Sequence, residues 1–132
     1  MEKLQEIMSF LESNRIQIFS TSVDNKPVSR PIGSAALCNG RIWYCMNNDK
    51  PMFKQLQDNP NVCICVCGSD FSWIRIYARV VFSDDKLIKN MYMQRPNSSF
   101  KSVDDPRFSV FYLSEIRAEI HIKGETKVIE ID

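Results

Sequence analysis

Two lysines, Lys50 and Lys54, stand one helical turn apart directly after a predicted strand. Pro51 favours the first position of a helix and disfavours helical geometry in the residue before it, which predicts Lys50 as the N-cap. Lysine is a poor N-cap because it has no acceptor for the free N–H groups and its charge opposes the helix dipole. A bound phosphate would accept from those N–H groups and pair with both ammonium groups. The predicted chemistry is anion binding, although on spacing alone two solvated lysines are the stronger interpretation.

A second unusual pattern lies on residues 71–82, the longest predicted strand, whose side chains alternate between two faces. One face is apolar, and the other carries Trp73, Arg75, Tyr77 and Arg79. Alternating aromatic and arginine side chains are typical of three kinds of surface: a stacking platform for single-stranded nucleic acid, a subunit interface or the wall of a ligand pocket. The formal net charge of +1 argues against nucleic acid and against an anionic membrane. An interface or a pocket is therefore the better interpretation.

The cysteines and the single histidine predict no metal site and no catalytic nucleophile. Cys63, Cys65 and Cys67 recur at every second residue of the predicted strand 61–67, where such side chains lie about 6.5–7 Å apart. Thiolates bound to one zinc must lie within about 4 Å of one another, so we expect these thiols to be buried packing. The chain has five cysteines and no CxxC motif, which argues against a secreted disulfide framework. His121 falls on a polar strand face and is predicted to face solvent.

Periodicity and turn residues predict the elements that hold these side chains. Helices are predicted over residues 2–13, from Pro51, and from 83–85 to before Pro96. Strands are predicted at residues 15–23, 27–37, 41–47, 61–67, 71–82, 108–113, 117–123 and 127–131. Residues 97–106 are polar and irregular and are expected to be mobile. Because hairpin turns join most strands, the sequence predicts a mainly antiparallel, partly open β-barrel with two or three short helices at its ends.

The apolar positions predict which side of each element is buried. The first helix is expected to bury Leu4, Ile7, Met8 and Leu11, and the third helix Leu87, Ile88, Met91 and Tyr92. Inward-facing strand residues are expected to include Ile74, Ile76, Ala78, Val80, Phe82, Ala118, Ile120 and Ile122.

Length and composition limit the kind of protein this is. The 132 residues, 44% hydrophobic and 25% charged, predict one compact globular domain over residues 1–132. The first residues are partly acidic and lack the apolar run of a signal peptide. No segment approaches the roughly 18 consecutive apolar residues of a membrane helix. The sequence therefore predicts a cytoplasmic protein.

Several blocks of residues, in order and at compatible spacing, resemble the pyridoxamine 5′-phosphate oxidase-like family of FMN-binding split barrels. The main blocks are Arg30-Pro31-Ile32-Gly33, Trp43-Tyr44-Cys45-Met46-Asn47-Asn48, Lys50-Pro51-Met52-Phe53-Lys54-Gln55-Leu56, Asn59-Pro60-Asn61-Val62 and Trp73-Ile74-Arg75. Asp104-Asp105-Pro106 and Val110-Phe111-Tyr112-Leu113 resemble the family's short members. The resemblance covers nearly the whole chain and implies a mainly β, antiparallel split β-barrel.

The same resemblance implies a homodimer with two FMN molecules at the subunit interface. It places Arg30, Pro31 and Ile32 along the isoalloxazine and ribityl chain, with Tyr44, Cys45, Met46 and Asn47 continuing the cradle. It further implies that Lys50 and Lys54 hold the phosphate and that Trp73 and Arg75 come from the interface. Cys45 and Met46 stand where hydroxyl side chains are frequent in the family, which leaves the backbone to make contacts there.

One departure from the family bears on function. True pyridoxamine-phosphate oxidases end in an arginine-rich segment, whereas this chain ends Lys-Val-Ile-Glu-Ile-Asp, so we expect no such activity. The main hypothesis is an FMN-dependent oxidoreductase that exchanges electrons with a small molecule, in which the flavin and no particular side chain carries the chemistry. Two alternatives remain. One is a protein that stores or senses flavin without turnover, and the other is a split-barrel module that binds haem, a deazaflavin or nucleic acid.

Overall fold

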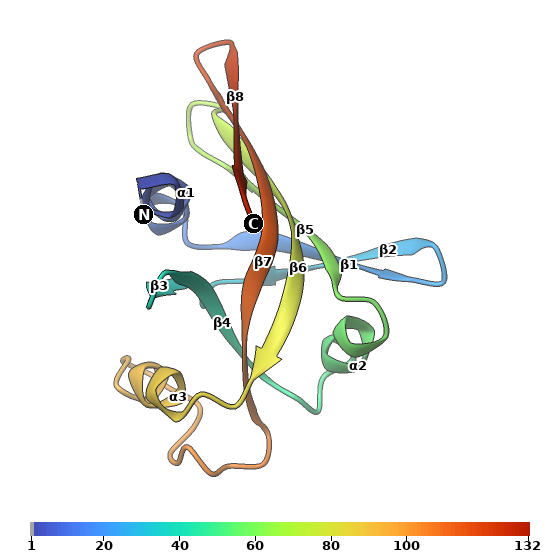
Figure 1. The fold of residues 1–132 in the computed structure, drawn as a ribbon, viewed down its shortest axis with the longest axis vertical. Coiled ribbons are helices and arrows are strands. Elements are labelled where there is room, and N and C mark those ends of the chain that lie inside the picture. Colours follow the sequence, from blue (N-terminus) through green and yellow to red (C-terminus); the bar gives the residue numbers. More distant parts are fainter. Residues whose placement is uncertain (1) are drawn as a thin grey trace.

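The structure is a computed structural model that describes residues 2–132 (Figure 1). Its helices are α1 (Glu2–Ser13), α2 (Pro51–Asp58) and α3 (Lys86–Met93). Its strands are β1 (Gln17–Val23), β2 (Lys26–Ile32), β3 (Ala36–Cys38), β4 (Arg41–Asn47), β5 (Asn61–Cys67), β6 (Trp73–Ser83), β7 (Phe108–Ile122) and β8 (Glu125–Ile131). No helix within residues 2–132 is long and apolar enough to cross a membrane.

The strands form one sheet in the order β2-β1-β5-β6-β7-β4-β3, with β8 paired to β7. Every pairing is antiparallel. Figure 1 shows the β5–β6 and β7–β8 connections projecting together at the top, α1 and α3 on the left and α2 on the right. The predicted mainly β, antiparallel barrel with two or three short helices is thus confirmed, and residues 2–132 contain three.

The main core fills the concave side of the sheet. The predicted stripe of α1 and the predicted inner face of β6 are buried there, apart from Phe82, which is partly buried. Phe111 on β7 lies at the centre, with ring centroids 5.8 Å from Phe19, 5.4 Å from Tyr44 and 5.5 Å from Phe82. These offset and edge-to-face aromatic contacts hold β1, β4, β6 and β7 together.

A second, smaller core lies between α3, the following segment and the other face of β4 and β7. It consists of Ala36, Trp43, Ile88, Tyr92, Phe100, Phe108 and Val110. Phe100 stacks on Phe108 at 4.2 Å between ring centroids and thereby anchors the irregular segment before β7. Leu87 was predicted to be buried but is 75% exposed. The buried positions of α3 (Lys86–Met93) are Ile88, Lys89 and Tyr92, while Met91, also predicted to be buried, is only partly buried.

The strand predicted at residues 27–37 is in fact two strands. β2 pairs with β1 and β3 pairs with β4, and these pairs lie at opposite ends of the strand order. Residues 33–35 therefore carry the chain from one end of the sheet to the other, which no local pattern signals.

The two strands predicted at residues 108–113 and 117–123 are one continuous strand, β7. Glu115 has a φ of 50°, and the register with β6 shifts there by one residue. This bulge bends β7 so that it continues past the barrel and pairs with β8. Ile122, predicted to face inward, is 45% exposed because it lies at the projecting tip. Phe71, predicted to begin β6, precedes it with a φ of 62° and is exposed.

The burial of side chains on the convex face differs most from expectation. This face is the side of the sheet opposite the main core, on which the side chains of Cys63, Cys65 and Cys67 lie beside those of Tyr77, Arg75 and Trp73. Val62, Ile64 and Val66 are buried as the alternation predicts, but Cys65 and Cys67 are exposed and Cys63 is only partly buried. The prediction of buried thiols was wrong because none of residues 2–132 covers this face of β5.

Candidate functional site

The start of α2 lacks the usual cap. Lys50 occupies the N-cap with φ −81° and ψ 149°, Pro51 follows, and no side chain of the described residues caps this end. By contrast, Asp85 caps α3 by accepting from Leu87 N at 2.9 Å and Ile88 N at 3.2 Å. Pro51 has no N–H, and Phe53 N already donates to Lys50 O at 3.0 Å. The Met52 N–H and the exposed Lys50 side chain therefore offer a donor and positive charge to an anion.

The second predicted lysine is engaged elsewhere. Lys54 Nζ lies 3.2 Å from Asp58 Oδ2, one turn further along α2. These side chains are 80% and 65% exposed, and such surface pairs contribute little stability. Lys54 can therefore leave Asp58 for a stronger anion, but Lys50 is the less committed of the two.

Arg30 reaches α2 from the neighbouring strand. Its Nη1 donates to Phe19 O at 3.1 Å, and its Nη2 donates to Gln55 Oε1 at 2.6 Å. The same oxygen accepts from Thr21 Oγ1 at 2.7 Å. Burial lowers the pKa of Arg30. Gln55 and Thr21 were absent from the sequence prediction because only the tertiary fold brings β1, β2 and α2 together.

The four predicted cradle residues of β4 divide between two environments. Tyr44 and Met46 point into the main core, where the Tyr44 hydroxyl donates to Gln17 Oε1 at 2.7 Å and burial raises the Tyr44 pKa. Their side chains cannot meet a ligand outside the barrel, so only their backbone can do so. Cys45 and Asn47 lie on the opposite face, partly accessible.

Beside Cys45 lies a cavity of about 540 Å³, bounded by Gly33, Ser34, Tyr92, Arg95 and residues 96–100. Cys45 N donates to Ser34 Oγ at 3.1 Å, and the Tyr92 hydroxyl donates to Ser34 O at 2.6 Å. Burial raises the pKa of the Cys45 thiol, while Ser34 and Arg95 act in the opposite direction.

This cavity has a cationic lining. Arg95 lies over the Tyr92 ring at 4.9 Å and makes only long hydrogen bonds, of 3.5 and 3.4 Å, to two carbonyl oxygens. Arg15 also borders the cavity, and none of the described residues that line it is acidic. Sequence reasoning missed Arg95 because a basic residue near a helix end is ordinary. The cavity can take a small anionic molecule.

Trp73 and Arg75 lie on the convex face, away from α2. The Arg75 guanidinium sits 4.9 Å from the Trp73 ring centroid and 3.0 Å from Glu119 Oε1. Trp73 stacks on His121 at 5.2 Å and 10°, so His121 is partly buried and not fully solvent-facing. Strand register places Pro31 of β2 on the same face as Arg75.

The fold and sequence match known proteins. The family profile described as Pyridoxamine 5′-phosphate oxidase matches residues 4–131. A NimC/NimA family protein from Clostridium acetobutylicum is 27% identical with a TM-score of 0.90, covering 98% of this chain and 93% of that one. General Stress Protein 26 from Bacillus anthracis is 17% identical with a TM-score of 0.76, covering 98% and 100%.

A third similar protein is named for the cofactor that it binds. A pyridoxamine 5′-phosphate oxidase-related, FMN binding protein from Nostoc punctiforme is 14% identical with a TM-score of 0.66, covering 97% of this chain and 95% of that one. No curated protein matches the chain. Since the profile spans nearly all of the sequence, the chain belongs to the pyridoxamine 5′-phosphate oxidase-like family and has its split-barrel fold.

Proposed function

We propose that this protein is an FMN-binding oxidoreductase that works as a homodimer. The observation that carries the proposal is the uncapped, lysine-led start of α2, in a family fold shared with an FMN binding protein. Bound FMN would supply the transfer of electrons, while the chain supplies binding, orientation and the surroundings of the ring. Its five free cysteines fit the reducing cytoplasm.

The phosphate end of this proposal fits the residues present. The Met52 N–H and Lys50 would hold the phosphate, with Lys54 contributing when it leaves Asp58. Arg30, fixed by Gln55, joins β2 to α2 at this end. Pro31 and Ile32 then lead along β2, and the backbone of Tyr44 and Met46 with the side chains of Cys45 and Asn47 completes the cradle.

The cationic cavity beside Cys45 would form the substrate side. The cavity is lined by Cys45, which belongs to the proposed cradle, and by Gly33 and Ser34, which directly follow the cradle residue Ile32. A molecule held in this cavity would therefore lie close to the flavin. Arg95 and Arg15 favour an anionic substrate.

The convex face would form the dimer interface. The side chains of Ile18, Tyr77 and Val128 on this face are 45%, 43% and 45% exposed, beside the stacked Trp73, Arg75 and His121. Aromatic and arginine side chains beside exposed aliphatic ones are typical of interface centres. Trp73 and Arg75 would then approach the flavin bound by the partner.

The freshly purified protein should absorb at about 450 nm and release FMN on denaturation.

Lys50→Ala should weaken FMN binding roughly tenfold or more while changing riboflavin binding little, because Lys50 would contact only the phosphate. Lys54→Ala should have a smaller effect, since Lys54 is shared with Asp58. Titration of the apoprotein with each flavin measures both affinities. Equal losses for FMN and riboflavin would refute the phosphate role, and a colourless protein that takes up neither flavin would refute the function.

The cationic cavity should bind benzoate better than benzyl alcohol, which has the same ring without the charge. Arg95→Gln should lower benzoate affinity about tenfold, because a charge-assisted hydrogen bond is lost. Arg41→Gln is the matched control, since Arg41 lies outside the cavity and stacks on Tyr112. Calorimetric titration of both variants measures this directly. If both substitutions weaken benzoate alike, Arg95 has no special role.

A further inference from the structure

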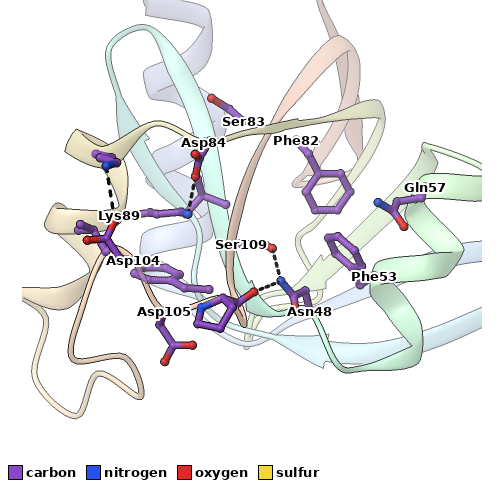
Figure 2. Close-up of a pocket in the computed structure, with 15 residues that line it drawn as sticks. Asn48, Phe53, Gln57, Phe82, Ser83, Asp84, Lys89, Asp104, Asp105 and Ser109 are labelled. Atoms are coloured by element: carbon purple, nitrogen blue, oxygen red, sulfur yellow. Dashed lines mark hydrogen bonds and ion pairs between the residues drawn. The ribbon is translucent and has the colours of Figure 1, made fainter.

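A separate cavity of about 540 Å³ lies between α2, α3 and the segment that leads into β7 (Figure 2). Phe53 and Phe82 form one wall, in edge-to-face contact at 5.0 Å between ring centroids, and Phe108 also lines the cavity. None of the residues assigned to the proposed flavin cradle lines this cavity. The cavity is therefore distinct from the proposed flavin cradle.

A buried ammonium group borders this cavity. The Lys89 side chain is only 8% exposed, and its Nζ lies 2.6 Å from Asp84 Oδ1 and 5.6 Å from the Phe108 ring centroid. Figure 2 shows Lys89 reaching across to Asp84. An ammonium has three N–H donors, and buried donors are normally satisfied. Within residues 2–132 the Lys89 ammonium donates only to Asp84, so the other N–H groups of Lys89 need oxygen atoms from another source.

The other charges around the cavity already have partners. Lys86 Nζ lies 3.4 Å from Asp104 Oδ1, and Arg107 Nη2 lies 3.1 Å from Asp105 Oδ2. The Lys89 ammonium likewise faces the negative charge of Asp84. A second carboxylate at Lys89 would be repelled by Asp84, whereas a neutral carbonyl oxygen would not. The electrostatic balance favours an uncharged ligand.

We propose that this cavity binds an uncharged aromatic molecule that carries a carbonyl group. Its ring would pack against the phenylalanines, and its carbonyl oxygen would accept from Lys89 Nζ. Hydrogen bonds to charged donors are stronger than those between neutral groups. Lys89 would therefore select for the carbonyl, and the apolar wall for the ring. This proposal does not depend on flavin binding.

Three probes of one ring size test it. 2-Acetylnaphthalene carries a neutral carbonyl, 2-ethylnaphthalene carries no acceptor, and 2-naphthoate carries a charge. Calorimetric titration of the purified full-length protein should show 2-acetylnaphthalene binding about tenfold more tightly than 2-ethylnaphthalene and more tightly than 2-naphthoate. Lys89→Met should abolish the preference for the acetyl compound. The matched control Lys86→Met, on the same helix and bordering the same cavity, should keep it.

A second variant leaves the buried lysine in place. Asp84→Asn removes the charge that faces Lys89, so 2-naphthoate should bind about tenfold more tightly while 2-acetylnaphthalene changes little. This variant decides the matter if Lys89→Met fails to fold. Equal affinity for the acetyl and ethyl compounds, equal effects of Lys89→Met and Lys86→Met, or no gain for 2-naphthoate in Asp84→Asn would each overturn the proposal. In those cases water alone would satisfy Lys89.

Discussion

Replacing Phe111 with alanine should lower the free energy of unfolding by about 3–5 kcal/mol. Phe111 is fully buried and contacts Phe19, Tyr44 and Phe82. Its removal takes apolar area out of the core and leaves a cavity between strands that are far apart in the sequence and cannot close together, because hydrogen bonds fix the spacing between paired strands. Equilibrium unfolding in urea, followed by tryptophan fluorescence, measures the change.

Phe71→Ala is the matched control, because it removes the same side chain from an exposed position. Phe71 is 84% exposed in the turn before β6, so its loss should change the unfolding free energy by no more than about 0.5 kcal/mol. A loss below about 1 kcal/mol for Phe111→Ala would mean that the core relaxes around the gap. In that case Phe111 would not be the centre that joins the four strands.

Local alternation predicted the packing of most elements. The stripe of α1 and the inner face of β6 depend only on helical and strand periodicity, and those residues are buried as expected. The errors arose where a distant part of the chain decides the outcome. β2 ends at Ile32 because β3 must pair at the other end of the sheet, and β7 continues through Glu115 because β6 and β8 lie beside it.

In the candidate site, too, local sequence predicted some features, while others depend on contacts between distant parts of the chain. Pro51 alone predicted where α2 begins and that Lys50 would lie at its N-cap. The contact between Arg30 and Gln55 could not be predicted, since the two residues are 25 positions apart and meet only through the barrel. Likewise, alternation put Cys65 opposite the buried face of β5, but it could not tell whether another layer of the chain covers that face.

Trp73→Ala should weaken the proposed dimer about thirtyfold or more, because a tryptophan at the centre of an interface typically contributes at least about 2 kcal/mol. In the single chain Trp73 is only partly buried, stacked between His121 and Arg75. Truncation removes this stack and leaves both neighbours without their packing partner. Sedimentation velocity over a dilution series measures the dimer dissociation constant, and Phe71→Ala, an exposed aromatic outside the strands, should leave it unchanged.

FMN affinity distinguishes an interface residue from one that also serves the cofactor. If the flavin lies between the subunits, dimer dissociation removes one side of its site, so Trp73→Ala should lower FMN affinity and dimer stability together. At protein concentrations high enough to restore the dimer, part of the FMN affinity should return by mass action. FMN affinity that is unchanged in the monomer would place the whole flavin site within one chain. An unchanged dimer would instead move the interface away from the convex face, because Trp73 has the largest side chain in the row it shares with Arg75, Tyr77 and Arg79.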